Sequence, residues 1–118
     1  MIRQAIREDI PTIMSIVRSA QCALAELGID QWQDGYPSVE AIESDIEQGV
    51  GYVACNEQDA PIGYAAIVLT GEEAYKQIST WDTGEDYVVV HRLCVLGDCR
   101  RQGISYRLMR YAAEQARK

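Results

Sequence analysis

The chain has 118 residues, 47% of them hydrophobic, and carries a formal net charge of −7 at pH 7. This length predicts a single domain over residues 1–118, and no apolar run approaches the length of a membrane span. The overall acidity opposes non-specific nucleic-acid binding, and because no signal-peptide pattern is present, a cytoplasmic location is expected.

The charge is divided unevenly along the chain. Residues 92–118 carry seven basic and two acidic side chains, a net charge of +5, whereas residues 1–91 carry four basic and sixteen acidic ones, a net charge of −12. The basic end suits a small polyphosphate and the acidic part suits a cationic acceptor such as an amine, although charge runs often only solvate a surface. The cysteines form no Cys-x-x-Cys pair and the chain has a single histidine, so reduced thiols are expected and no zinc site.

The N-terminal segment predicts a short strand and then a long amphipathic helix. The strand is expected over residues 2–6. Asp9 is the expected N-cap of the helix, with Pro11 in its first turn and Gly28 at its end. The apolar residues of this helix recur at helical spacing: Ile10, Ile13, Met14, Val17, Ala20, Leu24 and Leu27.

A polar and aromatic loop follows at residues 29–37. Trp32 and Tyr36 stand beside Asp34 and Gly35, a combination that can line an acceptor pocket. The two aromatic side chains could equally well pin the loop onto the core, and the sequence does not choose between these interpretations.

A second helix and a hairpin are predicted next. Ser38 is expected to cap a helix over residues 39–48, with Val39, Ile42 and Ile46 pointing inward and Gly49 as its stop. Residues 51–55 and 62–69 would form the two strands of the hairpin.

The last third of the chain begins with an irregular segment. Residues 70–86 are polar with no clear period, and a long excursion over the acceptor side is expected there. A fourth strand is predicted over residues 87–95 and a final helix over residues 103–118.

The junction between that strand and that helix predicts a phosphate-binding turn. It contains Arg100, Arg101, Gln102 and Gly103 just before the helix. The unpaired N–H groups of a helix N-terminus attract anions, arginine forms charge-assisted bonds to phosphate oxygens, and glycine lets a ligand approach the backbone. An ordinary solvated turn is the simpler interpretation.

The turn and its context resemble the acyl-CoA-binding core of the Gcn5-related N-acetyltransferases, the GNAT superfamily. That family carries Gln/Arg-x-x-Gly-x-Gly/Ala after a strand that often ends Leu-x-Val, and this chain has Ser105 in the last position. The resemblance implies an α+β fold in the order strand, helix, helix, three strands, helix, with a mainly antiparallel four-stranded sheet. It implies acetyl-CoA as co-substrate and no metal. The residues implied to bind the cofactor are Leu93, Cys94, Val95, Arg100, Arg101, Gln102, Gly103, Ile104 and Ser105.

The general base is the weakest part of the resemblance. Some relatives place a glutamate where this chain has Val89. His91 lies two residues further on, and strict alternation would put it on the same face as Leu93. Its ordinary pKa near 6.5 suits proton removal at neutral pH, so His91 is the catalytic candidate, with a packed histidine as the alternative. Asp34 and Glu85 are further candidates that would act through water.

The resembled fold normally continues with a fifth strand, a fourth helix and a hairpin, which this sequence lacks. The expectation is therefore an open sheet edge at the fourth strand and a possible homodimer through that edge. Leu108, Met109 and Tyr111 of the last helix would be partly uncovered.

Three functions are compatible with the sequence. The resemblance implies an N-acetyltransferase acting on a primary amine of a small molecule or peptide, with Trp32, Asp34 and Tyr36 on the acceptor side. The alternative is a non-catalytic acyl-CoA-binding or regulatory module, or an inactive fragment of such an enzyme. A nucleic-acid-binding module is opposed by the overall acidity, and no membrane partner is expected.

Overall fold

A four-stranded antiparallel sheet forms the centre of the computed structural model, which describes residues 1–29, 32, 35–69, 88–99 and 102–116. The strands lie in the order of the sequence: β1 (Ile2–Gln4), β2 (Gly51–Cys55), β3 (Pro61–Leu69) and β4 (Val88–Val95). This confirms the predicted α+β fold and its sheet. The expected excursion at 70–86 lies outside the described residues.

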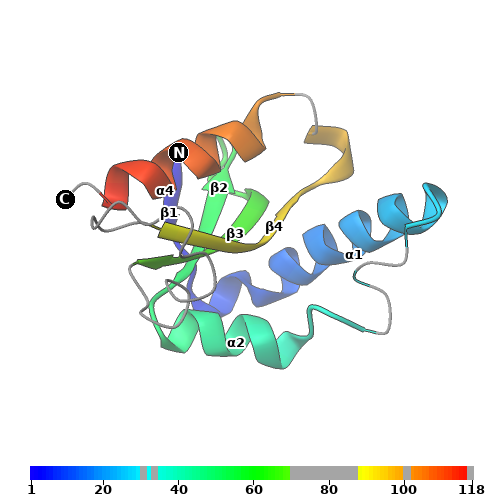
Figure 1. The fold of residues 1–118 in the computed structure, drawn as a ribbon, viewed down its shortest axis with the longest axis horizontal. Coiled ribbons are helices and arrows are strands. Elements are labelled where there is room, and N and C mark those ends of the chain that lie inside the picture. The colour runs from blue at the N-terminus through cyan, green and yellow to red at the C-terminus, as the bar shows by residue number, and fades with distance from the viewer. Residues whose placement is uncertain (30–31, 33–34, 70–87, 100–101, 117–118) are drawn as a thin grey trace, which may run out of the picture.

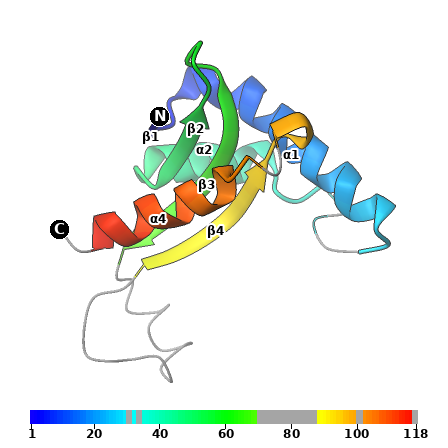
Figure 2. The same cartoon turned by 90° about the horizontal axis from the view of Figure 1, so that it is seen from above.

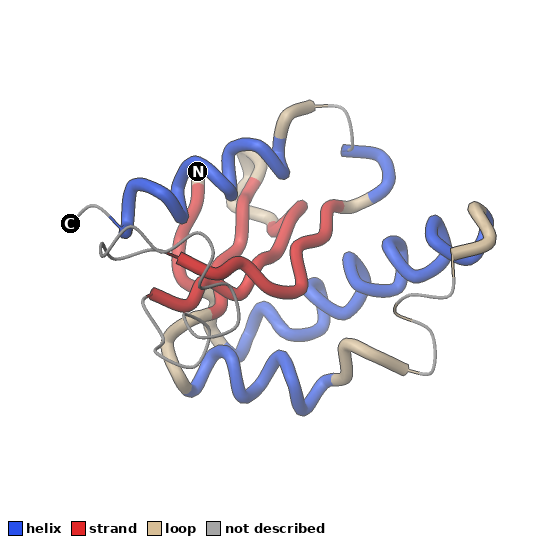
Figure 3. The backbone as a smooth tube through the Cα atoms, viewed as in Figure 1, coloured by secondary structure: helices blue, strands red, loops and turns tan. Residues whose placement is uncertain are grey.

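Helices cover both faces of the sheet. Helices α1 (Ile10–Glu26) and α2 (Val39–Glu47) lie on one face, and α4 (Ile104–Ala116) lies on the other (Figure 1, Figure 3). Figure 2, seen from above, places α4 in front of the sheet and α2 behind it. Among the described helices, none has both the length and the hydrophobicity that crossing a bilayer requires.

The helix boundaries follow local signals in the sequence. The Ser38 hydroxyl accepts a hydrogen bond from the Ala41 N–H at 3.2 Å and so caps α2 as predicted. Gly28 and Gly49 follow the ends of α1 and α2 with φ of 76° and 72°, a conformation that glycine adopts without steric penalty. Val39, expected to point inward, is instead exposed, because as the first residue of α2 it stands at the end of the helix.

The start of α1 differs from the expected cap. Asp9 occupies the N-cap position, but its side chain makes no capping hydrogen bond to the helix. Its carboxylate accepts hydrogen bonds from the Ile6 N–H and from the Arg3 guanidinium instead. Strand β1 therefore ends at Gln4 rather than at residue 6, because the chain turns into a short 3-10 helix (Arg7–Asp9) that presents Asp9 to Arg3.

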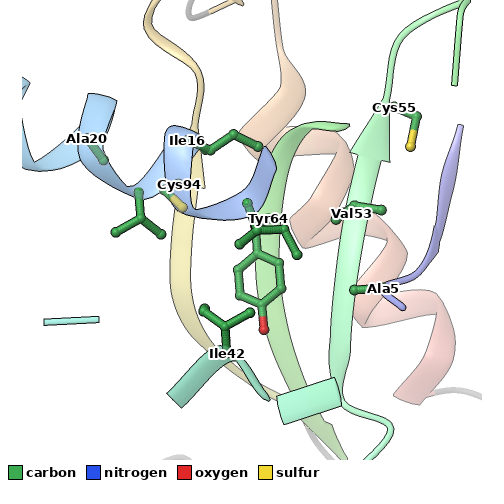
Figure 4. Packing of buried hydrophobic residues seen from close by; sticks show 10 residues of the cluster. Ala5, Ile16, Ala20, Ile42, Val53, Cys55, Tyr64 and Cys94 are labelled. Carbon is green, nitrogen blue, oxygen red and sulfur yellow. The ribbon is translucent and has the colours of Figure 1, made fainter. Parts of the chain in front are cut away.

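The sheet divides the core into two clusters. The first lies between the sheet and α1 and α2, and its centre is the fully buried ring of Tyr64 on β3 (Figure 4). The second lies between the sheet and α4, where Ile104, Leu108 and Ala112 are buried. Leu108 was expected to be partly uncovered, but it is fully buried because it packs over Gly63 of β3, whose missing side chain leaves room for it.

A β-bulge interrupts the pairing of β3 with β4. Ala66 is opposite His91 and Tyr64 is opposite Cys94, so β4 contains one extra residue there. Arg92 lies in this bulge with a φ of 54°. Leu93 packs on the α4 side together with Val90, whereas His91 lies opposite Ala66 on the other face. The expectation that His91 shares a face with Leu93 was therefore wrong, because the bulge breaks the alternation on which it depended.

Candidate functional site

A cavity of about 500 Å³ runs beside the C-terminal half of β4, between α1 and the start of α4. Its lining is mostly apolar and comes from both faces of the sheet and from one aromatic residue of the α1–α2 loop. The described residues that line it are Ala20, Ala23, Leu24, Leu27, Trp32, Leu93, Cys94, Val95 and Ser105. This volume and character suit a small organic ligand or the arm of a larger one.

The structure brings the two halves of the predicted cofactor site together. Leu93, Cys94 and Val95 line the cavity from β4, and Ser105 lines it from the first turn of α4. The side chain of Ile104 is buried against the sheet, so at that position only the backbone is available to a ligand. Arg100 and Arg101 lie outside the described residues.

The start of α4 is an open backbone turn at Gly103. Gly103 has a φ of 76°, and an added Cβ there would meet no atom within 4 Å. Its carbonyl accepts the first hydrogen bond of the helix, from Arg107 N–H at 3.0 Å. The N–H groups of the first turn therefore have no partner within the helix, and the helix dipole favours a negative group beside them. Gln102 and Gly103 are both exposed.

The aromatic residues of the α1–α2 loop lie at the other side of the cavity. The rings of Trp32 and Tyr36 meet edge to face, with 6.3 Å between their centroids. Trp32 packs against the first core cluster, as one interpretation of this loop expected, and it also lines the cavity. The Gln21 amide donates a hydrogen bond to the Tyr36 carbonyl at 2.8 Å, which ties the loop to α1. Asp34 lies outside the described residues.

A polar cluster around the buried Asp45 was not predicted from the sequence. The Asp45 carboxylate, on α2, forms an ion pair with the guanidinium of Arg92 through both of its oxygens. The Tyr64 hydroxyl donates to the same carboxylate at 2.6 Å, and Arg92 Nη1 donates to the Tyr36 hydroxyl at 3.0 Å. Asp45 is only 4% exposed, so this charge depends on these partners.

Burial and hydrogen bonding shift the pKa values of two members of this cluster, Tyr64 and Arg92. Burial, reinforced by the Asp45 carboxylate, raises the pKa of the Tyr64 phenol well above its ordinary value. The hydrogen bond to Asp45 raises the pKa of the Arg92 guanidinium, which therefore stays charged. Tyr64 thus acts as a permanent donor to Asp45, and neither Tyr64 nor Arg92 is a source of protons near neutral pH.

Two signals in the sequence could have pointed to this cluster. Asp45 stands between Ile42 and Ile46 on the buried face of a short amphipathic helix, where a carboxylate requires a partner. Arg92 stands inside the apolar run of β4. Neither signal identifies the other residue, because 47 positions separate the two in the sequence.

Residues 14–118 match the Acetyltransferase (GNAT) family. The chain belongs to this family. A comparison with curated proteins gave no match.

Solved structures of GNAT proteins share this fold. A GNAT-family acetyltransferase from Streptococcus agalactiae is 28% identical with a TM-score of 0.76, over 98% of this chain and 66% of that one. A second, from Listeria monocytogenes, is 26% identical with a TM-score of 0.70, over 98% and 67%. The N-acetylglutamate synthase of Neisseria gonorrhoeae, complexed with coenzyme A and N-acetyl-glutamate, is 24% identical with a TM-score of 0.64, over 99% and 22%. The chain thus spans about two thirds of the length of the first two.

In this GNAT chain the candidate base, His91, is exposed and is not among the described residues that line the cavity. That lining contains neither a carboxylate nor an imidazole. Within the same described part, no group of three histidine, cysteine or acidic side chains is placed to hold a metal ion.

Proposed function

We propose that this chain binds acetyl-CoA and transfers the acetyl group to a primary amine of a small molecule or a peptide. The observation that carries the proposal is the cavity that joins Leu93, Cys94 and Val95 of β4 to Ser105 at the start of α4. The diphosphate would bind the N–H groups around Gly103, with Arg100 and Arg101 contributing charge. The pantetheine arm would pair with the backbone of β4 as an added strand does.

The reaction needs a polarised thioester and an uncharged amine. An N–H near Leu93, beside the bulge, would donate to the thioester oxygen. The amine nitrogen would attack the carbonyl carbon, the carbon–sulfur bond would break, and coenzyme A would leave as a thiolate. The proton lost by the amine would go to His91 through water, since His91 is exposed and lies outside the described lining.

The acceptor would enter beside the aromatic loop. Trp32 lines the cavity, and Tyr36 packs against Trp32 with 44% of its own surface exposed. Together with Asp34, these residues would shape the acceptor side. Substituting them would leave acetyl-CoA binding nearly unchanged. The acidic balance of residues 1–91 would favour a cationic acceptor.

A non-catalytic acyl-CoA-binding module is the second candidate. It is favoured by one observation, the absence of a carboxylate or imidazole among the described residues of the cavity lining. Such a module would bind acetyl-CoA through the same turn but would leave the thioester intact in the presence of amines.

Calorimetric titration with acetyl-CoA tests the binding half of the proposal. Gly103→Val should weaken binding roughly 100-fold, because the branched side chain would occupy space that the phosphate oxygens need and would displace about two charge-assisted hydrogen bonds. Gly28→Val is a matched control: this glycine also has a φ of 76° and open space around its Cβ position. Its backbone strain is therefore similar, but acetyl-CoA affinity should stay at the wild-type value.

The transfer half is tested by measuring thiol release from acetyl-CoA with a panel of polyamines, amino-acid amides and peptides. Amine-dependent release supports the acetyltransferase, and tight binding without release supports the binding module. Equal affinity for acetyl-CoA in the folded Gly103→Val variant and the wild type would contradict both.

A further inference from the structure

We infer that Asp45 and Arg92 are positioning residues that hold the two facing walls of the cavity in fixed relation. The inference deepens the proposed acetyl transfer and rests on it for its kinetic consequence. It stands on the chain of contacts that leads from α2 through the β4 bulge to the aromatic loop.

The guanidinium of Arg92 is held at two points by the carboxylate of Asp45. Both oxygens of Asp45 accept hydrogen bonds from the guanidinium, with Nε at 2.8 Å from Oδ2. The Tyr64 hydroxyl donates to Oδ2 as well, and Tyr64 is itself fully buried. A planar guanidinium bound at two points to a buried carboxylate has little freedom to rotate.

The wall that β4 contributes to the cavity begins directly after Arg92. Arg92 has a φ of 54°, a conformation that residues with a side chain rarely adopt, so it persists only where the surroundings impose it. The next residues, Leu93 and Cys94, line the cavity from opposite faces of the sheet. The backbone angle at Arg92 sets where these two side chains point, and the ion pair with Asp45 anchors that angle.

Arg92 also contacts the aromatic wall of the cavity. Its Nη1 donates to the Tyr36 hydroxyl at 3.0 Å, and the Tyr36 ring forms a T-shaped contact with Trp32, which lines the cavity. The Arg92 side chain therefore contacts both Asp45 and Tyr36, while the Arg92 backbone leads directly into the β4 wall. Acetyl donor and amine acceptor would approach each other between these walls, so their separation depends on this contact.

A double-substitution cycle with Tyr36→Phe and Arg92→Lys tests the inference. Both variants are made in a Trp81→Phe background, so that Trp32 is the only tryptophan and acrylamide quenching of its fluorescence reports the position of the loop. Each single substitution should increase quenching, and the double variant should show no more quenching than Arg92→Lys alone, since both changes break the same contact.

The kinetic measurement uses acetyl-CoA and the amine of the panel with the fastest thiol release. Tyr36→Phe should raise the KM of the amine about fivefold, as expected for one hydrogen bond lost at a solvent-exposed site, with the KM of acetyl-CoA unchanged. Arg92→Lys should raise the amine KM to the same extent and also lower kcat about tenfold, because it disturbs the β4 wall too.

Two variants serve as matched controls. Arg7→Lys alters another arginine paired with a carboxylate of α2, the exposed Glu47 at 2.9 Å. Tyr106→Phe removes the hydroxyl of an exposed tyrosine on α4. Both should leave the quenching and the kinetic constants at their wild-type values.

The outcomes separate this inference from the proposed function. Additive or absent quenching changes would overturn the inference, whatever the activity. A wild-type protein that binds no acetyl-CoA would overturn the proposed function, while the quenching cycle still decides whether Arg92 holds the loop. Should Arg92→Lys fail to fold, Tyr36→Phe alone must still reproduce the increase in Trp32 quenching, because it leaves the buried ion pair intact.

Discussion

Gly63 on β3 shows how a single missing side chain allows α4 to lie close to the sheet. An added Cβ there would stand 2.9 Å from Ile104 Cγ2 and 3.3 Å from Leu108 Cδ1. The Cγ2 methyl belongs to a β-branched side chain with a stiff χ1, so it cannot move aside easily. We expect Gly63→Ala to lower the free energy of unfolding by about 1–3 kcal/mol, measured by urea denaturation.

A compensating substitution gives this prediction its control. Ile104→Ala removes the methyl group that the new Cβ would meet, and alone it should cost about 2–5 kcal/mol through the cavity that it leaves. In the double variant the two losses should be less than additive, because the methyl group introduced by Gly63→Ala would partly fill that cavity. Strict additivity would show that Gly63 and Ile104 are not in contact as described.

At the residue scale, the sequence was informative where the signal was local. The Ser38 cap and the glycines that follow α1 and α2 depend on side-chain or backbone properties of one residue and its near neighbours. The face of His91 was assigned wrongly because alternation holds only in an uninterrupted strand, and the bulge at Arg92 has no local signature in the sequence. The partner of Asp45 lies on another element, and periodicity does not identify such partners.

At the scale of the elements, one ion pair ties the first strand to the first helix. Arg3 donates to both oxygens of Asp9, at 2.8 and 3.1 Å, and also to Asp59 of the β2–β3 turn at 3.3 Å. The bonds from Arg3, with the one from Ile6 N–H, lower the pKa of the Asp9 carboxyl below its ordinary value of 3.8. The carboxylate therefore stabilises the fold in its charged form.

The pH dependence of this contribution follows from linkage. Because the folded-state pKa of Asp9 lies below its unfolded value, the stabilisation is complete above about pH 4 and is lost as the pH falls through the folded-state pKa. We expect Asp9→Asn to lower the free energy of unfolding by about 2 kcal/mol at pH 7, and the difference from wild type to shrink below pH 4. Urea unfolding between about pH 3 and pH 7 measures it.

Another carboxylate of the same region provides the control for this measurement. Glu47 pairs with Arg7 at 2.9 Å, but both side chains are more than half exposed. Glu47→Gln should therefore change the free energy of unfolding by less than about 0.5 kcal/mol at every pH. A difference for Asp9→Asn that stays constant down to pH 3 would rule out the depressed pKa.

The order of the elements was predictable because each short segment carries its own period and its own stop. The predicted hairpin and the last helix are observed as β2, β3 and α4, with small shifts of their ends. The GNAT family follows from the strand, turn and helix around Gly103 together with this order. The cavity was not predictable, since its lining joins α1, a loop, β4 and α4.

At the scale of the whole molecule, β4 is one of the two edge strands of the sheet within the described residues, and β1 is the other. Strand β4 pairs with β3 on one side, and the cavity lies along the C-terminal half of the strand. Unpaired N–H and C=O groups on an edge strand are a template for another strand. We expect the chain to self-associate through β4 and to form a homodimer at micromolar concentration, as measured by light scattering.

The effect of acetyl-CoA on the dimer tests whether the two chains meet at the β4 edge. A second chain and the pantetheine arm would compete for the same backbone groups, so saturating acetyl-CoA should shift the dimer toward monomer. The Gly103→Val variant, which should bind acetyl-CoA only weakly, should remain dimeric under the same conditions. A monomer at all concentrations would contradict the prediction, and a dimer indifferent to acetyl-CoA would place the contact elsewhere.

The bulge at Arg92 has a consequence for how this sequence would drift under different selective pressures. A left-handed conformation at a non-glycine residue such as Arg92 destabilises the fold by about 1–2 kcal/mol. Removing the partner of a buried carboxylate such as Asp45 destabilises it by about 3–5 kcal/mol. Selection for stability alone would therefore move several positions together, for example Arg92→Gly with Asp45→Leu and Tyr64→Phe. Selection for acetyl transfer would oppose every step of that path. Related sequences should therefore have Asp45, Tyr64 and Arg92 either all present or all replaced.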